Sequence, residues 1–330
     1  MGSTPAGHHT GWISTSLAPS RRERPSTQGR GAISSRSPRR RAGSPPPREL
    51  VEAGLSARKR LGQHFLRDRR ILSRIVDAAR LSAEDTVVEV GAGLGTLTAE
   101  LVKRAGKVVA VEVDEGLCGY LRRRFESSAN LSLVCADIRS QTPSQLLAAA
   151  GTQAPYLVVA NLPYYIAAPV LRHFLEAAEP PSRLIVMLQK EVAESIAAGP
   201  GHMSLLGLSV QLYGLPRLLF TVPPSAFYPP PKVHSAVLRI DVRETPAVDV
   251  DDIGRFFAFL RAGFSAPRKQ LRNAISNGLG LEGNVVAERM TGAGVDPRLR
   301  AQALGLEEWA VLYRAFKDTL PGKREAEEHR

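Results

Sequence analysis

The sequence predicts an α/β protein with a doubly wound, mostly parallel sheet, followed by a small domain built only of helices. Short β-branched runs alternate with helical patterns between residues 86 and 197, as in sheets whose parallel strands are joined by helices. A glycine-rich turn separates the first of these strands from the helix that follows it. Beyond about residue 245 the strand pattern ends and only helical patterns follow.

The expected elements follow in order along the chain. A first helix is expected over residues 68–80, with Asp68 capping its amino end, because its apolar residues recur every three or four positions. Strands are expected at 86–90, 107–114, 131–137, 156–163 and 182–189, with further strands at 205–222 and 233–242 closing the edge of the sheet. Helices are expected at 190–198, 251–263, 268–279, 283–292 and 306–317.

Composition excludes several classes of protein. No apolar run reaches the roughly 18 residues that a membrane helix needs. Cys118 and Cys135 are sparse and lack metal-ligand spacing, so we expect neither a disulfide framework nor a metal site. No secretory signal is evident at the amino terminus, so a reducing, cytoplasmic location is expected. The sequence shows no oligomerisation signal, so a monomer is the default expectation.

The ends of the expected strands carry groups suited to a nucleoside. Gly91, Gly93 and Gly95 form the turn "EVGAGLG", where glycine lets the backbone turn tightly and approach a ligand. Glu112 ends the second strand, where a carboxylate can accept hydrogen bonds from both hydroxyls of a ribose. Asp137 ends the third strand and could accept a hydrogen bond from an adenine amino group.

The glycine turn favours S-adenosylmethionine over NAD as the ligand. A dinucleotide fits a GxGxxG turn, whereas the spacing here is GxGxG. Glu89 lies just before the turn, where a carboxylate would repel a pyrophosphate but suit a sulfonium and an ammonium group. Asp114, near the end of the second strand, is interpreted as a helix N-cap or turn residue.

The fourth strand ends in Asn161-Leu162-Pro163-Tyr164, a sequence suited to an adenine amine. This amine is a poor nucleophile because its lone pair is delocalised into the ring. The side-chain carbonyl of Asn161 and the backbone carbonyl of Leu162 could accept its two N–H groups and favour a more pyramidal nitrogen. Pro163 fixes the chain direction, and Tyr164 offers a flat face on which the base can stack. An ordinary Asn-Pro turn is the alternative, and Tyr165 is interpreted as packing.

Taken together, these motifs resemble the KsgA/RsmA family of small-subunit (16S) ribosomal RNA adenine N6,N6-dimethyltransferases. The resemblance covers roughly residues 57–318 and runs through "RKRLGQHFLRD", "VVEVGAGLGTLT", "VVAVEVD", "ADI", "NLPYYI", "MLQKEVAESIAA", "VPPSAFYPPPKVHSAVLRI" and "FSAPRKQLRNAI". It implies a Rossmann-like, class I S-adenosylmethionine-dependent methyltransferase. The expected substrate is 16S rRNA in a small-subunit assembly intermediate, dimethylated at two adjacent adenines in a hairpin near its 3′ end.

The resemblance also implies roles for individual residues. The family's cofactor positions correspond to His64, Leu66, Gly91, Glu112, Asp137 and Asn161, and His64 stands where the family often has Asn. Phe227 resembles the aromatic residue that sandwiches the target base against Tyr164, and a core aromatic that anchors its loop is the alternative. Candidate phosphate contacts are Arg58, Lys59, Arg60, Lys190, Lys232, Arg268, Lys269 and Arg272, of which the last three are expected on one helix. Taken singly, each of these is more typical of a solvated surface charge.

Four regions are therefore expected along the chain. Residues 1–55 are expected to be a disordered basic extension, because they are rich in Ser, Pro and Arg and lack periodic apolar residues. The first 50 residues alone hold nine Arg, no Lys and two Glu, which is more than half of the net charge of +12. A nucleic-acid-binding tail, a transit peptide and a start codon set too early are alternatives. The methyltransferase domain (56–244), a helical RNA-binding domain (245–320) and a flexible tail (321–330) follow.

Two rival functions remain open at this point. One is a related methyltransferase that modifies large-subunit RNA and confers antibiotic resistance. The other is a ribosome-assembly or transcription-associated binding protein that has lost catalysis. A damaged glycine turn or a damaged Asn-Leu-Pro-Tyr sequence would favour the second, and both are intact.

Overall fold

The computed structural model describes residues 45–58 and 61–320 of the chain. Most of the expected extension, the expected tail and the candidate RNA contacts Lys59 and Arg60 lie outside these residues.

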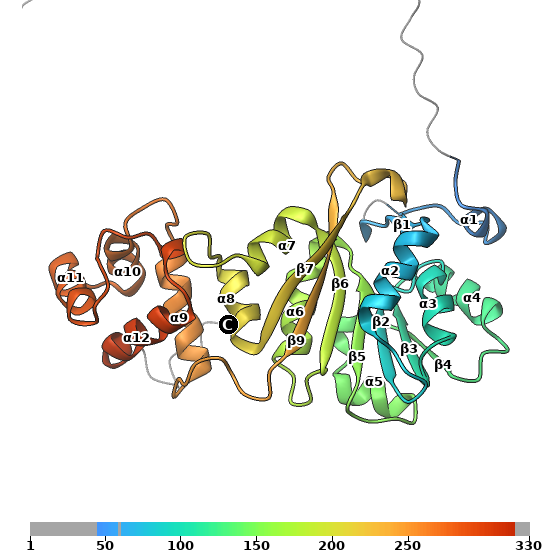
Figure 1. Ribbon diagram of the computed structural model, residues 1–330, viewed down its shortest axis with the longest axis horizontal. Helices are drawn as coiled ribbons and strands as arrows, with labels where there is room; N and C mark the ends of the chain where they lie inside the picture. Colours follow the sequence, from blue (N-terminus) through green and yellow to red (C-terminus); the bar gives the residue numbers. More distant parts are fainter. Residues whose placement is uncertain (1–44, 59–60, 321–330) are drawn as a thin grey trace, which may run out of the picture. The chain divides into compact units, whose positions relative to one another are not determined.

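Seven strands form the central sheet: β2 (Thr86–Val90), β3 (Lys107–Glu112), β4 (Leu131–Cys135), β5 (Leu157–Asn161), β6 (Arg183–Gln189), β7 (Gly214–Val222) and β9 (Ser235–Val242). Their order across the sheet is β4-β3-β2-β5-β6-β9-β7 (Figure 1). Neighbouring strands from β4 to β6 are parallel, whereas β9 is antiparallel to both β6 and β7. The predicted doubly wound, mostly parallel sheet is confirmed.

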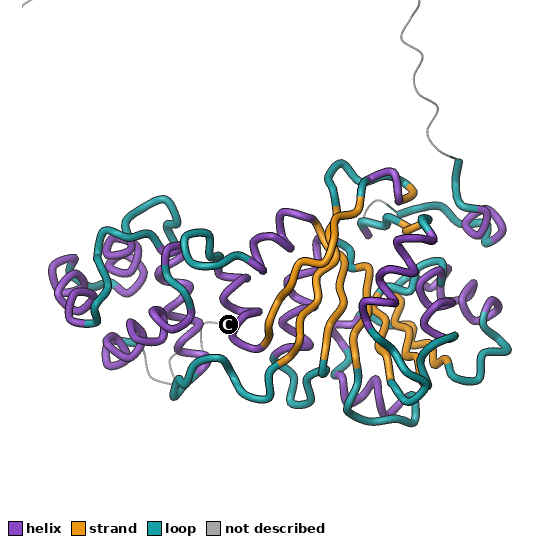
Figure 2. The backbone as a smooth tube through the Cα atoms, viewed as in Figure 1, coloured by secondary structure: helices purple, strands orange, loops and turns teal. Residues whose placement is uncertain are grey.

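Helices cover both faces of this sheet (Figure 2). One face packs against α2 (Arg69–Ala79), α3 (Thr96–Val102) and α4 (Glu115–Arg124), and the other against α5 (Pro143–Ala149), α6 (Ala167–Leu175), α7 (Lys190–Ala197) and α8 (Leu205–Tyr213). Successive residues of a strand point to opposite faces of the sheet. Val87 and Val108 pack toward α2 and α3, whereas Val88 and Val109 pack toward α5 and α6. Burial on both faces explains why β2, β3, β5 and β6 are mostly apolar rather than alternating between apolar and polar residues. As predicted, Asp68 caps α2, accepting from the N–H groups of the first turn.

The prediction of a strand over residues 205–222 was wrong in its first half, because residues 205–213 form α8. Ser204 caps this helix. Val210 packs in the core beneath the sheet, while Leu208 and Leu212 pack among the C-terminal helices. A helix buried on opposite sides lacks the one-sided apolar pattern of an amphipathic helix, so its continuous apolar run was read as a strand.

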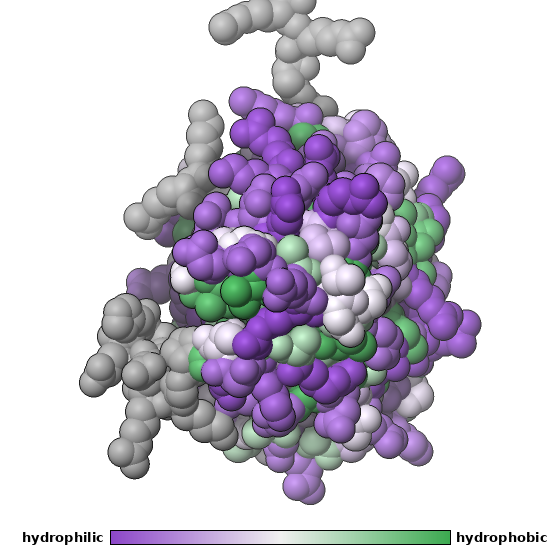
Figure 3. Space-filling model, turned by 90° about the vertical axis from the view of Figure 1, so that its left-hand side faces the viewer, coloured by the Kyte–Doolittle hydropathy of each residue, from purple (hydrophilic) through white to green (hydrophobic). Residues whose placement is uncertain are grey.

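Four helices build the C-terminal region: α9 (Ile253–Phe264), α10 (Leu271–Leu279), α11 (Gly283–Gly292) and α12 (Leu306–Phe316). Buried aromatic side chains fill the space between them, among them Phe256, Phe259, Trp309, Tyr313 and Phe316. On the side of the molecule where these helices lie, hydrophilic residues dominate the surface, with small apolar patches between them (Figure 3). The predicted helical region is thus confirmed. Within residues 45–58 and 61–320, none of the helices has the length and apolar character of a membrane span.

Part of the expected disordered extension is structured. Residues Arg48–Glu52 form helix α1, and Leu50, which is only 2% exposed, packs against Phe65, Leu94 and Leu117. One buried residue in a five-residue helix produces no periodic pattern, so this contact could not be predicted from the sequence. The extension expected over residues 1–55 therefore does not reach as far as residue 55.

A second, two-stranded sheet connects two segments. One lies in the N-terminal motif "RKRLGQHFLRD" (58–68), and the other lies in the proline-rich loop "VPPSAFYPPPKV" (222–233). It consists of β1 (Phe65–Leu66) and β8 (Phe227–Tyr228), paired antiparallel with Phe65 opposite Tyr228. Two segments far apart in the sequence are thereby held beside the ends of the parallel strands.

Candidate active site

A pocket opens at the carboxyl ends of the parallel strands, where the strand order reverses between β2 and β5. Ligands of doubly wound sheets bind at such switch points. Candidate residues that follow four different strands line this pocket: Gly91 and Gly93 after β2, Glu112 at the end of β3, Asp137 after β4 and Asn161 at the end of β5. The structure therefore brings together groups that the sequence placed at separate strand ends.

The turn after β2 depends on glycine for its backbone conformation. Gly91 and Gly95 have φ angles of 75° and 73°, in the left-handed region that favours glycine. A Cβ on Gly95 would lie 2.6 Å from Cε2 of Phe125. The N–H of Gly91 donates to the carbonyl of Val111 at 2.8 Å, which fixes the turn against β3. The turn therefore presents backbone directly to the pocket.

Glu112 is held in one orientation by the backbone around it. Its Oε2 accepts from the N–H of Gly93 at 2.8 Å, and its Oε1 accepts from those of Val113 and Asp114 at 3.0 and 2.9 Å. Burial raises the pKa of Glu112, and these three N–H groups oppose that shift because they stabilise the carboxylate. A fixed carboxylate that lines the pocket is suited to bind a ribose diol.

Glu89 does not act as the sequence suggested. Its side chain is 1% exposed and accepts a hydrogen bond from Oγ1 of Thr98 on α3 at 2.6 Å. Burial raises its pKa to about 8, so the carboxyl is largely protonated near neutral pH. Glu89 is absent from the pocket lining and cannot attract a cationic ligand, so this argument for the methyl donor was wrong although the donor itself was correctly predicted.

Asp137 has a cationic partner that the sequence did not reveal. It caps the short 3-10 helix η2 (Ile138–Ser140), and its carboxylate forms a two-point ion pair with the guanidinium of Arg139, at 2.6 Å between Oδ2 and Nη2. The hydrogen bond from Arg139 lowers the pKa of Asp137, so this carboxylate is ionised at neutral pH. Arg139 also lines the pocket.

Asp114 is a helix cap, as interpreted from the sequence. It is 4% exposed and accepts from the N–H groups of Gly116 and Leu117 at the start of α4. Its other oxygen lies 3.1 Å from Nη1 of Arg58. Arg58 therefore has an internal partner, which makes it a weaker candidate for a phosphate contact than the sequence suggested.

The amide of Asn161 is oriented by the N-terminal motif. Its Nδ2 donates to the backbone carbonyl of His64 at 3.2 Å. Because this bond uses the amide nitrogen, the oxygen Oδ1 is left as an acceptor at the pocket. The neighbouring Leu162 donates its N–H to the carbonyl of Met187 on β6 at 3.0 Å, which fixes the backbone that carries both residues.

Tyr164 is the first residue of the 3-10 helix η3 (Tyr164–Ile166) and lines the pocket. Its hydroxyl is hydrogen-bonded to Oγ of Ser235, a fully buried residue, at 2.7 Å. The ring of His64 stacks on it with a centroid distance of 5.9 Å and an interplanar angle of 28°. His64 is itself anchored, because its Nδ1 lies 2.6 Å from the carbonyl of Pro229. Burial raises the pKa of Tyr164, so its hydroxyl stays protonated.

Two residues carried over from the resemblance are mainly core residues. Phe227 is 2% exposed and packs with Ile71 and Val222, although it also lines the pocket. Leu66 is 4% exposed and pairs with Phe227 in the small sheet. Leu66 is not among the residues that line the pocket, and its expected cofactor contact stays a prediction.

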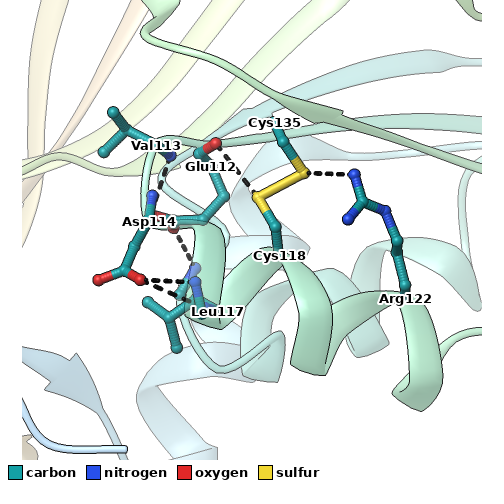
Figure 4. The surroundings of a disulfide bond; sticks show 9 residues. Glu112, Val113, Asp114, Leu117, Cys118, Arg122 and Cys135 are labelled. Carbon is teal, nitrogen blue, oxygen red and sulfur yellow. Dashed lines mark hydrogen bonds between the residues drawn. A yellow bond between two sulfur atoms is a disulfide. The ribbon is translucent and has the colours of Figure 1, made fainter.

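The two cysteines are paired, which contradicts the expectation that they form no disulfide. Cys118 on α4 is bonded to Cys135, the last residue of β4 (Figure 4). Their Cα atoms lie 6.1 Å apart because α4 packs directly against β4, a contact that sequence spacing does not reveal. The bond joins α4, which carries the pocket residue Leu117, to the end of β4, just before the pocket residues Ala136 and Asp137. Sγ of Cys118 lies 3.5 Å from the backbone carbonyl of Glu112.

The other described basic candidates lie in two places. Lys190 begins α7 and is 3.4 Å from Glu194, while the exposed Lys232 lies in the proline-rich loop. The prediction that Arg268 and Lys269 share a helix with Arg272 was wrong, since α10 begins only at Leu271. The first N–H groups of α10 donate to carbonyls of a later loop, at 2.6 Å from Leu271 to Leu299, which fixes where the helix starts.

Sequence reasoning missed several residues at these surfaces. Arg139 and Tyr165 line the pocket, and Tyr165 is 57% exposed, so its interpretation as packing was wrong. The sequence "NLPYYI" does not predict that the second tyrosine is exposed. The two tyrosine side chains point in different directions because they lie in a 3-10 helix, which was not predicted from the sequence. Arg298 and Arg300 are exposed in the loop that caps α10, and only this long-range contact places them near Arg272.

The residues present fit S-adenosylmethionine. The bare glycine turn gives room for a close approach, and the carboxylates of Glu112 and Asp137 suit a ribose and an adenine amine. Apolar side chains such as Val90, Val111 and Ile138 line the space between them. Together with the strand order, these features define a class I S-adenosylmethionine-dependent methyltransferase.

Comparisons with known proteins identify the family. Residues 54–318 match the family model described as ribosomal RNA adenine dimethylase. The chain belongs to this family, whose members dimethylate adenine in ribosomal RNA.

Similar proteins span nearly the same length. The chain is 48% identical over 266 residues to ribosomal RNA small subunit methyltransferase A of Dehalococcoides mccartyi, covering 80% of this chain and 90% of the relative. It is 41% identical to the protein of that name from Moorella thermoacetica, covering 81% and 94%. The solved 23S rRNA methyltransferase ErmE superposes with a TM-score of 0.60 at 26% identity, covering 77% and 99%. A dimethyladenosine transferase from Plasmodium falciparum shares the fold, with a TM-score of 0.65 at 24% identity, covering 78% and 98%.

Proposed function

We propose that this enzyme dimethylates the N6 amines of two adjacent adenines in a hairpin near the 3′ end of 16S rRNA, during assembly of the small subunit. The observation that carries the reaction is the oriented oxygen of Asn161 beside Tyr164, at the same switch point as Glu112. Relatives named for the small-subunit RNA match over about nine-tenths of their own length, which supports the choice of substrate.

The target amine is activated by acceptors rather than by a base. Oδ1 of Asn161 and the backbone carbonyl of Leu162 accept its two N–H groups, which makes the nitrogen lone pair available. Bound S-adenosylmethionine supplies an electrophilic methyl group. Methylation makes the amine acidic, so its surplus proton passes to water and no strong base is required. The protein contributes by positioning the amine against the methyl group and by accepting the hydrogen bonds of its N–H groups.

The target base is held by aromatic rings. Tyr164 presents its face, and its orientation is fixed by the hydroxyl of Ser235 and by the ring of His64. Phe227 closes the other side of the base, with its ring anchored in the core. Such stacking contributes about 1–3 kcal/mol per base. A pocket of this kind must also admit an amine that already carries one methyl group.

Two groups of cations form the proposed RNA surface. Lys190 begins α7 directly after β6, and its backbone N–H donates to the carbonyl of His234, two residues after Lys232. The second group surrounds the start of α10 and consists of Arg268, Lys269, Arg272, Arg298 and Arg300. Each phosphate that a cation neutralises releases counterions, so binding should weaken as the salt concentration rises.

We further propose that the enzyme acts as a monomer in the cytoplasm, on an incompletely assembled small subunit. Maturing subunits supply the exposed hairpin that the pocket requires, and the charged surface near α10 suits a polyanionic partner rather than a second copy.

Incubation with radiolabelled S-adenosylmethionine and either unmethylated small subunits or large subunits tests this function. Label is expected in the small-subunit RNA, at adenines near its 3′ end. Label found only in large-subunit RNA would favour the activity named for ErmE instead. Binding of subunits without any transfer would favour an assembly factor that has lost catalysis.

A further inference from the structure

Tyr165 presents an exposed aromatic side chain at the mouth of the pocket. It lines the pocket, yet 57% of its surface is exposed, whereas its neighbour Tyr164 is half-buried. Both belong to η3, and successive residues of a 3-10 helix point about 120° apart. One tyrosine therefore points into the wall of the pocket and the next toward its rim.

The backbone supports the ring of Tyr165. Gly62 lies against it, and a Cβ on that residue would be 3.4 Å from Cδ1 of Tyr165. Gly62 has a φ of 57°, a conformation that favours glycine, so this close approach is built into the N-terminal motif. The backbone at Gly62 therefore supports one side of the Tyr165 ring.

A cation lies at the same rim. Arg139 lines the pocket and is held by Asp137, while 55% of its side chain remains exposed. An exposed aromatic face beside an oriented guanidinium suits a nucleotide, because the base can stack on the ring and the phosphate can approach the cation.

We propose that Tyr165 is a stacking subsite for the nucleotide next to the target adenine, with Arg139 facing the phosphate between the two nucleotides. This inference rests on the proposed function. A base that enters the pocket must leave its stack, which deprives the neighbouring base of one partner at the mouth. Tyr165 replaces that partner and contributes only when RNA is bound.

Two substitutions of Tyr165 test the subsite on unmethylated small subunits. Tyr165→Leu removes the aromatic face but keeps an apolar side chain, and Tyr165→Phe keeps the face. We expect kcat/KM for the subunit to fall about 5- to 100-fold in the Leu variant and to stay within two-fold in the Phe variant. Binding of S-adenosylhomocysteine, measured by calorimetry, should stay within two-fold in both.

Three results would overturn the inference, and they are distinguishable. A Leu variant as active as the wild type would show that no base stacks there. A parallel loss of S-adenosylhomocysteine binding would make Tyr165 part of the cofactor site instead. A wild-type enzyme that leaves small subunits unmethylated would refute the proposed function, and the subsite with it.

Discussion

At the scale of single residues, the site is built from side chains whose hydrogen-bonding capacity is already partly used by the protein itself. Asn161 uses its nitrogen on His64, and Glu112 uses lone pairs on three backbone N–H groups. Both residues line the pocket, and these hydrogen bonds hold their side chains in one orientation before a ligand arrives. Such preorganised groups are the main source of electrostatic catalysis in enzymes.

The stacking role of Tyr164 leads to the first prediction. Tyr164→Ala should lower methyl transfer to small subunits by 100-fold or more, because the target base loses its platform. Binding of S-adenosylhomocysteine should change little. Tyr164→Phe is the matched control, since it loses only the hydrogen bond to Ser235 and should keep most of the activity. Equal losses of transfer and cofactor binding in the Ala variant would argue against stacking.

Glu89 should make stability depend on pH. Its pKa is about 8 in the folded protein and 4.5 as the reference value, so the unfolded chain releases this proton first as the pH rises. The stabilising contribution is full below about pH 4.5 and falls between that pH and about 8, by up to about 1.4 kcal/mol per pH unit. Glu89→Gln keeps an acceptor for Thr98 but cannot titrate.

Urea unfolding at pH 6 and pH 8 measures this effect. Between the two values, the wild type should lose more stability than Glu89→Gln, although both retain Glu112. The same pH dependence in the two proteins would show that Glu89 is ionised when buried.

At the scale of elements, the predictable parts were those with a local signal. The run "TVVEV" and the apolar spacing after Asp68 are sufficient for β2 and α2, because burial on both faces or on one face leaves a pattern in the sequence. α8 has no such pattern, since it packs between two cores, and Leu50 is a single buried residue in a short helix. Both wrong predictions, at α8 and at α1, concern elements whose structure depends on contacts with distant segments of the chain.

The site divides in the same way. Glu112 and Asn161 follow from the strand ends, because parallel strands bring their carboxyl ends to one edge. Other features of the site could not be predicted from the strand ends. The ion pair of Arg139 with Asp137, the disulfide at Cys118 and the burial of Glu89 depend on the directions of side chains. Periodicity gives no information about those directions at a turn.

The packing of α9 against α12 leads to a prediction about one glycine. A Cβ on Gly263 would overlap the buried indole of Trp309, so Gly263→Ala should lower the free energy of unfolding by about 1–3 kcal/mol. Gly283→Ala on α11 is the matched control, because nothing lies within 4 Å of the added carbon. That variant should be neutral or slightly stabilised. Thermal unfolding of both variants would check this, and equal effects would contradict the packing account.

At the scale of the whole molecule, the N-terminal segment belongs partly to the enzyme. A chain that begins at residue 45 should keep its activity on purified small subunits within a few-fold. A chain that begins at residue 56 loses Leu50, which packs against Leu117 in the wall of the pocket. Loss of such a buried leucine should lower the free energy of unfolding by about 2–5 kcal/mol and weaken cofactor binding.

Melting temperatures and calorimetry of the two truncated chains would measure the difference. Equal stability of both would show that α1 contributes nothing. A large loss of activity in the longer chain would instead make the basic residues before position 45 part of the RNA-binding surface.

The function proposed for this pocket is methyl transfer to adenine amines of small-subunit RNA. Mass spectrometry of nucleosides from unmethylated small subunits, after incubation with the enzyme and S-adenosylmethionine, tests it most directly. We expect N6,N6-dimethyladenosine at two adjacent positions near the 3′ end of the 16S rRNA, and none with Tyr164→Ala over the same time. A different methylated nucleoside, or no dimethyladenosine from an enzyme that binds its cofactor, would contradict it.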